Sequence, residues 1–325
     1  MSIEVEKYLR DLDRCNLNMR LFKNTDFMLY LDSNNHKLNA FPGFSKNGVE
    51  RVDITLPHDR LSLYLKRFYT NEKHTKEAIS NEIVFSRLYN ALGVNAVKAY
   101  PIILSRWSEK NSYGMDVAIG TENLNSIRGI HCEPFSSDIE FYKFIRKYNL
   151  NIEKILAHQD EFIESSKHPE SARSLIANYV KTSMLDIICM LIDNHIGNKN
   201  IVRYNRKPFE DVVSYDFEDS HLDKYCVVDF ERFDQIINNG NHVFEGEVKL
   251  NSTSLTYMDY LSYMKKIMED GALPPECVEL IKNIIELNFD DVIRDSENST
   301  GFHIPQYKKD YFQKLIDVNQ EFFSR

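Results

Sequence analysis

Three polar side chains in the segment LIDNHIGNKNIV have types and spacing that fit phosphoryl transfer. Asp193, His195 and Asn198 form the pattern D-x-H-x-x-N after an apolar run. Phosphoryl transfer needs an acid that orients the acceptor hydroxyl, oxygen ligands for Mg²⁺ and a positive group on the phosphates. We therefore expect Asp193 to face an acceptor hydroxyl and the amide oxygen of Asn198 to face a metal. A plain helix end, capped by Asn194 or Asn198 with Gly197 in the turn, is the alternative explanation.

Three charged residues elsewhere in the chain are candidates for the other groups that phosphoryl transfer needs. Lys66 lies in the apolar run LYLKRFY, and Glu82 follows in the next predicted helix. An ammonium group that points inward needs a partner or a ligand, and Glu82 is placed to be that partner. In the alternative explanation, Lys66 lies on an edge strand and both Lys66 and Glu82 are solvated surface charges. Asp229 ends the run YCVVDF, where a carboxylate at a strand end can bind metal or can simply cap a turn. His195 has no HExxH or Cys/His companions, so we expect no zinc site and consider a loop-bracing hydrogen bond its ordinary role.

The hydrophobic pattern changes type along the chain. Between residues 26 and 69, four short β-type runs are separated by Asn, Gly, Pro and Asp, which predicts an antiparallel meander. A helix over 75–93 follows, then two more strands, and the signal beyond residue 125 is mostly helical. The predicted fold class is α+β with two lobes: a sheet-plus-helix lobe over 1–124 and a mainly helical lobe over 125–325.

Composition restricts the class of protein further. The net charge is −9 over 325 residues, so a nucleic-acid partner is not expected, because such a surface needs clustered Lys and Arg. No apolar run approaches the length of about 18 residues that a membrane span requires. Five widely separated cysteines indicate a reducing compartment, so we expect a cytoplasmic protein.

These residues carry a resemblance to the HipA-like protein kinases, a branch of the protein-kinase-like superfamily related to the phosphoinositide kinases. MLDIICMLIDNHIGNKNIV resembles the helix and catalytic loop of that group, and YCVVDFERF resembles its metal-binding Asp strand. LYLKRFY followed by NEIVFSRLYNALGVNAVKAYPI is similar to its ATP-lysine strand, the following helix and the next strand. The resemblance covers about residues 60–235 and implies a bilobal, ATP- and Mg²⁺-dependent kinase.

The resemblance also implies a role for each site residue. Lys66 contacts the ATP phosphates and is held by Glu82, while Asp193, with His195 beside it, orients the acceptor hydroxyl and takes its proton. The implied Mg²⁺ ligands are Asn198 and Asp229. Adenine docks on the backbone of the segment after MDVAIG, around Glu122 and Leu124.

Three departures from the family pattern keep alternatives open. Asn194 replaces the usual Arg, Phe230 follows the metal Asp where a glycine is usual, and no glycine-rich phosphate loop is evident apart from PGFSKNG. The aminoglycoside/choline kinase loop also fits DNHIGN, although the apolar CMLI before Asp193 fits the HipA-like helix better. We expect a kinase acting on Ser/Thr hydroxyls of a protein substrate, with a small-molecule phosphotransferase or a binding-only pseudokinase as the alternatives.

Overall fold

The computed structural model describes a large part of the chain in two compact units. The described residues are 20–21, 29–32, 37–41, 49–55, 60–68, 72–105, 115–126, 129–191, 196–205, 210–217, 233–235, 237 and 256–325. Within 20–62, 65–76 and 102–118, and at 122 and 126, the description is limited to the backbone of those residues.

The two units are not continuous in sequence. Unit 1 gathers described residues within 1–87, 97–128 and 290–305, and unit 2 gathers those within 88–96, 129–289 and 306–325. The hydrophobic pattern predicts a single boundary at 124/125, whereas residues 88–96 and 290–305 each belong with residues far from them in the chain. The local sequence pattern does not predict that a segment rejoins an earlier unit, because this depends on contacts between segments far apart in the chain.

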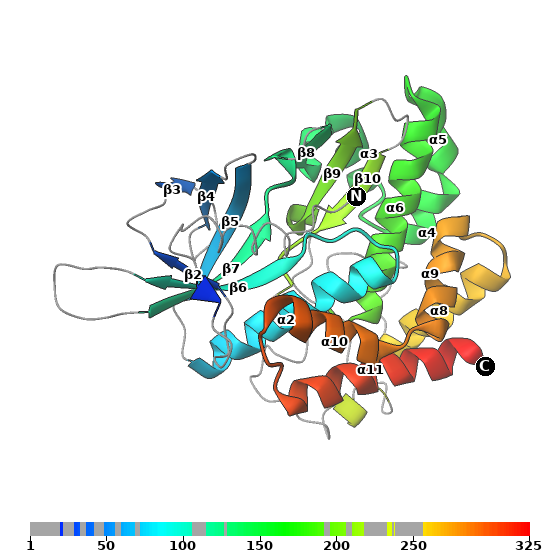
Figure 1. The fold of residues 1–325 in the computed structure, drawn as a ribbon. Coiled ribbons are helices and arrows are strands. Elements are labelled where there is room, and N and C mark those ends of the chain that lie inside the picture. Colours follow the sequence, from blue (N-terminus) through cyan, green and yellow to red (C-terminus); the bar gives the residue numbers. More distant parts are fainter. Residues whose placement is uncertain are drawn as a thin grey trace. The chain divides into compact units, whose positions relative to one another are not determined.

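Unit 1 contains a seven-stranded sheet whose order is β1-β2-β6-β7-β5-β4-β3 (Figure 1). All neighbouring pairs run antiparallel except β2 and β6, which are parallel. The strands are β1 (Arg20–Leu21), β2 (Leu29–Asp32), β3 (Lys37–Phe41), β4 (Val49–Thr55), β5 (Arg60–Phe68), β6 (Ala99–Ser105) and β7 (Met115–Glu122).

The predicted meander is therefore confirmed for β3, β4 and β5 and wrong for β2. Strand β2 pairs with β1 and β6, on the far side of the sheet from β3. Alternation and turn residues identify a strand, but the choice of its partner depends on non-local pairing.

Helix α2 (Glu72–Ala91) follows β5 and is buried over most of its length. It ends where the sequence predicts, because Gly93 adopts a left-handed φ of 74° that glycine tolerates at little cost. Within unit 1, Arg87 ties α2 to its neighbours: its guanidinium donates to Ser299 Oγ of α10 (Phe289–Thr300) and to the carbonyl of Ala99, both at 3.0 Å.

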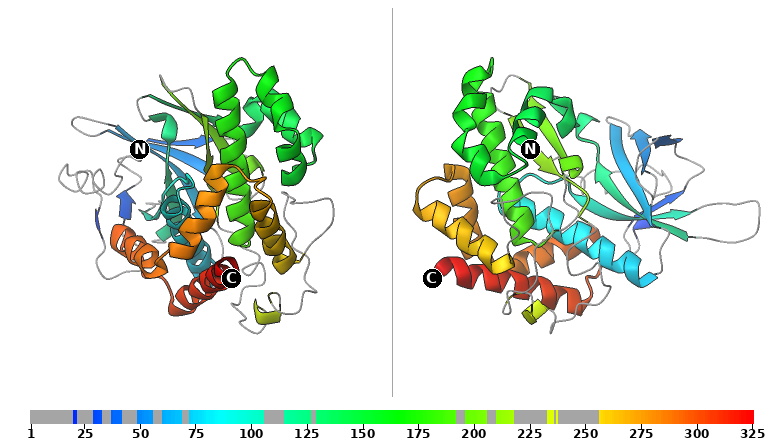
Figure 2. Two further views of the ribbon diagram at one scale, coloured as in Figure 1. Left: turned by 90° about the vertical axis from the view of Figure 1, so that its right-hand side faces the viewer. Right: turned by 180° about the vertical axis from the view of Figure 1, so that it is seen from behind.

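Unit 2 is mainly helical, with a three-stranded antiparallel sheet in the order β10-β9-β8. Its long helix α6 packs against β10, α5, α8 and α9, and α11 lies beside α9 (Figure 2). Its elements are β8 (Ile130–Pro134), η3 (Phe135–Ser137), α3 (Ile139–Lys147), α4 (Ile152–Ala157), α5 (Gln159–Ser165), α6 (Pro169–Ile188), η4 (Ile196–Asn198), β9 (Lys199–Tyr204), β10 (Glu210–Ser214), α8 (Tyr257–Glu269), α9 (Pro275–Glu286) and α11 (Gln306–Ser324).

An aromatic cluster forms the core beneath α3. Phe141 and Phe144 of α3 contact Phe162 of α5 with ring centroids 5.2 and 5.0 Å apart, and Phe141 also meets Tyr179 of α6 edge-on. Burying such rings contributes strongly to the stability of a fold. This packing fixes α6, which leads into the predicted catalytic loop. Among the helices that the structure describes, none is long and apolar enough to cross a membrane.

Candidate active site

Helix α6 ends before the D-x-H-x-x-N motif begins. The Leu191 N–H donates to the Asp186 carbonyl (3.0 Å) and the Met190 N–H to the Ile187 carbonyl (2.9 Å), the two bonds of a Schellman motif. Met190 carries the left-handed φ of 54° that glycine usually adopts in this motif. The helix is thus closed by its own backbone, and the explanation in which Asn198 caps it is wrong.

The predicted metal ligand Asn198 ends the short turn η4 and is only 6% exposed. Its backbone carbonyl accepts a hydrogen bond from the Tyr215 N–H at 3.1 Å. The Tyr215 hydroxyl donates to the carbonyl of the preceding residue, Gly197, at 2.5 Å. Two hydrogen bonds from one residue therefore hold this turn against the end of β10.

The residue after Tyr215 is Asp216, which is not among the site residues predicted from the sequence. Strands β9 and β10 form an antiparallel hairpin in which Lys199 is opposite Ser214, so Asn198 and Asp216 lie at the same end of the ladder. Asp216 has a left-handed φ of 66°, an uncommon conformation for a residue other than glycine that often marks functional turns. The structure thus brings an amide and a carboxylate, the oxygen ligands that Mg²⁺ prefers, to one end of the hairpin.

Asp216 was missed because its segment was interpreted as the acidic tip of a long hairpin. The local signal is the strand-like stretch DVVSYDF, in which an Asp follows two valines, a Ser and a Tyr and precedes a Phe. Phe217 anchors this turn: it is 1% exposed, and its ring centroid lies 4.9 Å from that of Tyr89.

A buried ion pair lies directly beside η4. Lys199 Nζ is 2.7 Å from Asp186 Oδ2, with the two side chains 0% and 5% exposed. The Tyr89 hydroxyl donates to Asp186 Oδ1 at 2.6 Å. Burial raises the pKa of Asp186, while Lys199 and Tyr89 act in the opposite direction by stabilising the carboxylate.

The Tyr215 side chain is partly buried. Burial, with the Asp216 carboxylate as the next cause, raises the pKa of the Tyr215 phenol to about 12. The phenol therefore keeps its proton at neutral pH and remains a donor to the Gly197 carbonyl.

Lys66 and Glu82 lie on β5 and α2 of unit 1. β5 is an interior strand, and the backbone of Lys66 is opposite Val49 on one side and Ile119 on the other. The edge-strand alternative for Lys66 is therefore wrong. Glu82 is 2% exposed, so it is no solvated surface charge. Because only the backbone of Lys66 is described, its pairing with Glu82 stays a prediction.

The predicted adenine segment continues directly from β7. After Glu122, the Asn123 side chain accepts a hydrogen bond from the Asn125 N–H at 3.1 Å, and Leu124 begins the short turn η2 (Leu124–Ser126). Asn123 is 4% exposed and Leu124 is half-buried. This local turn fixes the path of the backbone that we expect adenine to meet.

Three predicted residues, Asp193, His195 and Asp229, lie outside the described residues. Their roles stay predictions. Across the described part of the chain, no group of three or more His, Cys, Asp or Glu side chains is arranged to hold a metal ion.

Comparison with known proteins concerns the fold. This chain is similar to the crystal structure of a Helicobacter pylori proinflammatory kinase, CtkA, with a TM-score of 0.53 and 12% sequence identity, over 88% of this chain and 93% of that one. No protein-family model and no curated protein matches the sequence. The α+β fold of this chain is therefore kinase-like, as the sequence predicts.

Proposed function

We propose that this protein is a Mg²⁺-ATP-dependent kinase that transfers the γ-phosphate of ATP to Ser or Thr hydroxyls of a protein substrate. The observation that carries the proposal is that Asn198, the last residue of the D-x-H-x-x-N segment, and Asp216 lie at the same end of the β9–β10 hairpin. The kinase-like fold and the resemblance to HipA-like kinases support it.

The residues at this end of the hairpin fit Mg²⁺. Asn198 offers an amide oxygen from η4 and Asp216 a carboxylate from the segment after β10, and the two segments are joined by the hydrogen bonds that Tyr215 donates to Asn198 and Gly197. Bound Mg²⁺ would neutralise the phosphate charge that develops during transfer. We assign the metal to Asn198 and Asp216, with Asp229, predicted from the sequence, as the rival carboxylate.

The proposed chemical step is an in-line displacement. The acceptor oxygen forms a bond to the γ-phosphorus as the bond between that phosphorus and the β–γ bridging oxygen breaks, and ADP leaves. Asp193 orients the acceptor hydroxyl and takes its proton, and His195 braces the loop that carries Asp193. The chain contributes mainly by positioning these groups.

The nucleotide is held by residues of unit 1. Lys66 contacts the α- and β-phosphates as a point charge and pairs with Glu82, whose burial requires a cationic or hydrogen-bonding partner. Adenine meets backbone groups of the segment from Glu122 to Leu124, where the turn after β7 presents them.

The test is transfer of labelled γ-phosphate from Mg²⁺-ATP. Wild type and Asp193→Ala are each offered generic protein substrates, a panel of hydroxyl metabolites and the protein itself. We expect label on protein with wild type and none with the variant. If label appears only on metabolites, the acceptor is a small molecule and the proposal of a protein substrate is wrong. ATP binding without any transfer refutes the proposal in favour of a binding-only pseudokinase.

A paired substitution tests the metal assignment. We expect Asp216→Asn to reduce the rate of transfer by about a thousandfold or more. Loss of a single electrostatic group at a reacting centre lowers the rate by about 10²–10³, and loss of a metal ligand weakens every contact that the metal makes with the phosphates. Asp229→Asn serves as the matched change at the rival carboxylate. Full activity in Asp216→Asn, with loss in Asp229→Asn, would refute the assignment to Asp216.

A further inference from the structure

Three side chains from distant parts of the chain form a buried polar cluster next to η4. Lys199 begins β9, Asp186 lies in the last turn of α6, and Tyr89 lies near the end of α2. Both carboxylate oxygens of Asp186 are engaged, Oδ2 by Lys199 Nζ at 2.7 Å and Oδ1 by the Tyr89 hydroxyl at 2.6 Å. Lys199 is therefore held at a defined point relative to α6.

A buried ion pair is weak evidence of a stabilising role. Removing a carboxylate and an ammonium from water is costly, and well-packed apolar side chains of similar volume often stabilise a fold as much or more. An ion pair differs from an apolar contact in being directional, because its geometry must be kept for the buried charges to be compensated. Such a pair restricts the segments it joins to one arrangement.

The segment fixed by Lys199 is the one that carries Asn198. The two residues share a peptide bond, so the position of Lys199 limits the orientation of Asn198. From the other side, Tyr215 donates to the carbonyls of Asn198 and Gly197. The turn η4 is thus held between the buried cluster and the residue that precedes Asp216.

We propose that Lys199, Asp186 and Tyr89 are positioning residues that set the orientation of Asn198 relative to Asp216. They touch neither substrate nor metal, and they act by fixing the backbone at the start of β9. The inference rests on the proposed function for its consequence in catalysis, although its structural part stands on the geometry of the cluster.

The test compares wild type with Asp186→Asn/Lys199→Met, which removes both charges while keeping the approximate volume and leaving an acceptor for Tyr89. One readout is hydrogen exchange of the Tyr215 amide, which is protected by the Asn198 carbonyl. The second is the KM for Mg²⁺ in phosphoryl transfer, measured beside the KM for ATP. Amides of α9 and α11 report whether unit 2 remains folded.

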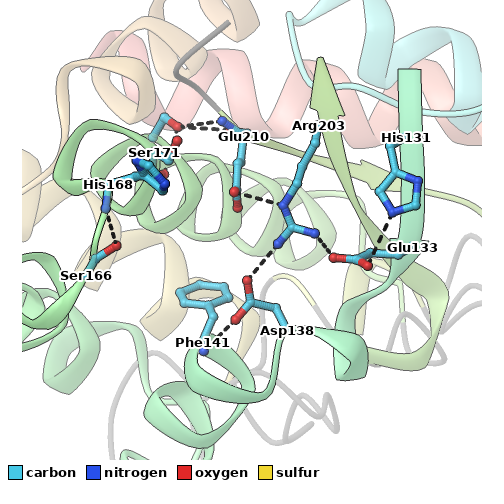
Figure 3. A network of polar contacts seen from close by, with 10 residues as sticks. His131, Glu133, Asp138, Phe141, Ser166, His168, Ser171, Arg203 and Glu210 are labelled. Carbon is cyan, nitrogen blue, oxygen red and sulfur yellow. Dashed lines mark hydrogen bonds and ion pairs between the residues drawn. The ribbon is translucent and has the colours of Figure 1, made fainter. Parts of the chain in front are cut away.

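Glu210→Gln provides a matched control on the opposite strand of the same hairpin. Glu210 accepts from Arg203 Nε at 2.9 Å, and Arg203 also pairs with Asp138 at 2.8 Å and with Glu133 (Figure 3). Arg203 is one-third exposed and lies about 13 Å along β9 from Lys199 at the usual rise of a strand. The control removes a charge from the hairpin without touching η4.

We expect the double variant to keep exchange protection in α9 and α11, to exchange the Tyr215 amide about tenfold faster and to raise the KM for Mg²⁺ about tenfold. The KM for ATP and the behaviour of Glu210→Gln should stay close to wild type. Wild-type Tyr215 exchange in the folded double variant would overturn the inference. If wild type transfers no phosphate, the proposed function fails, and the Tyr215 exchange rate still decides the positioning role. Should the double variant unfold, Tyr89→Phe is measured with the same Tyr215 readout and decides in the same way.

Discussion

Replacing Tyr89 by Phe removes one oxygen atom from the buried cluster and leaves the rest of the side chain in place. Tyr89 is 0% exposed, so water has no access to replace the lost donor. The ring keeps its contact with Phe217 at 4.9 Å. The change therefore isolates the hydrogen bond from the Tyr89 hydroxyl to Asp186.

The magnitude follows from the kind of bond that is lost. The Tyr89 hydroxyl lies 2.6 Å from Asp186 Oδ1, a short contact typical of a charged acceptor. A hydrogen bond to a charged group contributes about 1.5–3 kcal/mol. We expect Tyr89→Phe to lower the free energy of unfolding of unit 2 by about 2 kcal/mol, and to raise the pKa of Asp186 further, because burial already raises it.

Native-state hydrogen exchange of α6 and α9 is the appropriate assay. The described chain forms two compact units, so a single global transition would mix their stabilities. Tyr148→Phe is the matched control, since the Tyr148 hydroxyl also lies 2.6 Å from a carboxylate oxygen, Glu161 Oε2, but in an exposed position. We expect no measurable change there, because water replaces the lost partner.

Two results would refute this reasoning. A loss below about 0.5 kcal/mol in Tyr89→Phe would mean that the bond to Asp186 contributes less than a typical neutral hydrogen bond. Equal losses in Tyr89→Phe and Tyr148→Phe would mean that burial does not decide the effect.

Three further predictions concern other residues of unit 2. Tyr215→Phe removes the donor to Gly197, so we expect Mg²⁺-dependent transfer to fall about fivefold or more, as a hydrogen bond of about 1 kcal/mol predicts, with the circular dichroism spectrum unchanged; transfer at the wild-type rate would contradict the clamp. Burial raises the pKa of the Cys132 thiol to about 11 from 9, so the unfolded state loses its proton first as pH rises. Stability should therefore fall by up to about 3 kcal/mol between pH 9 and 11, and Cys132→Ser should lose less over that window in urea titrations; equal slopes would contradict the assignment. Cys189 and Cys277 are 0% exposed with raised thiol pKa values, so peptide mass spectrometry should find both unmodified after maleimide treatment at pH 8, and rapid native labelling of either would contradict their burial.

The sequence by itself determined the α+β class and several of its elements. Apolar periodicity predicts α2 and a mainly helical region beyond residue 125, and the turn residues between short apolar runs predict β3, β4 and β5. These features depend on residues close together in the chain, so a single sequence contains the information they need. The polar motif around Asn198 was recognisable for the same reason.

Only the tertiary structure showed that Asp216 follows β10 at the end of the hairpin that also carries Asn198. Strand β10 is short, and its pairing with β9 depends on the register between the strands and not on a local signal. The sequence alone therefore does not distinguish Asp216 from the other acidic residues of its segment.

The buried cluster is a further case. Tyr89, Asp186 and Lys199 each belong to a different element, and no local pattern pairs them. Their contact depends on how the last residues of α2, from 88 onward, pack with α6 and β9 in unit 2. A charge that is costly to bury alone becomes tolerable only when packing supplies its partner, and packing between distant segments is what local sequence patterns do not contain.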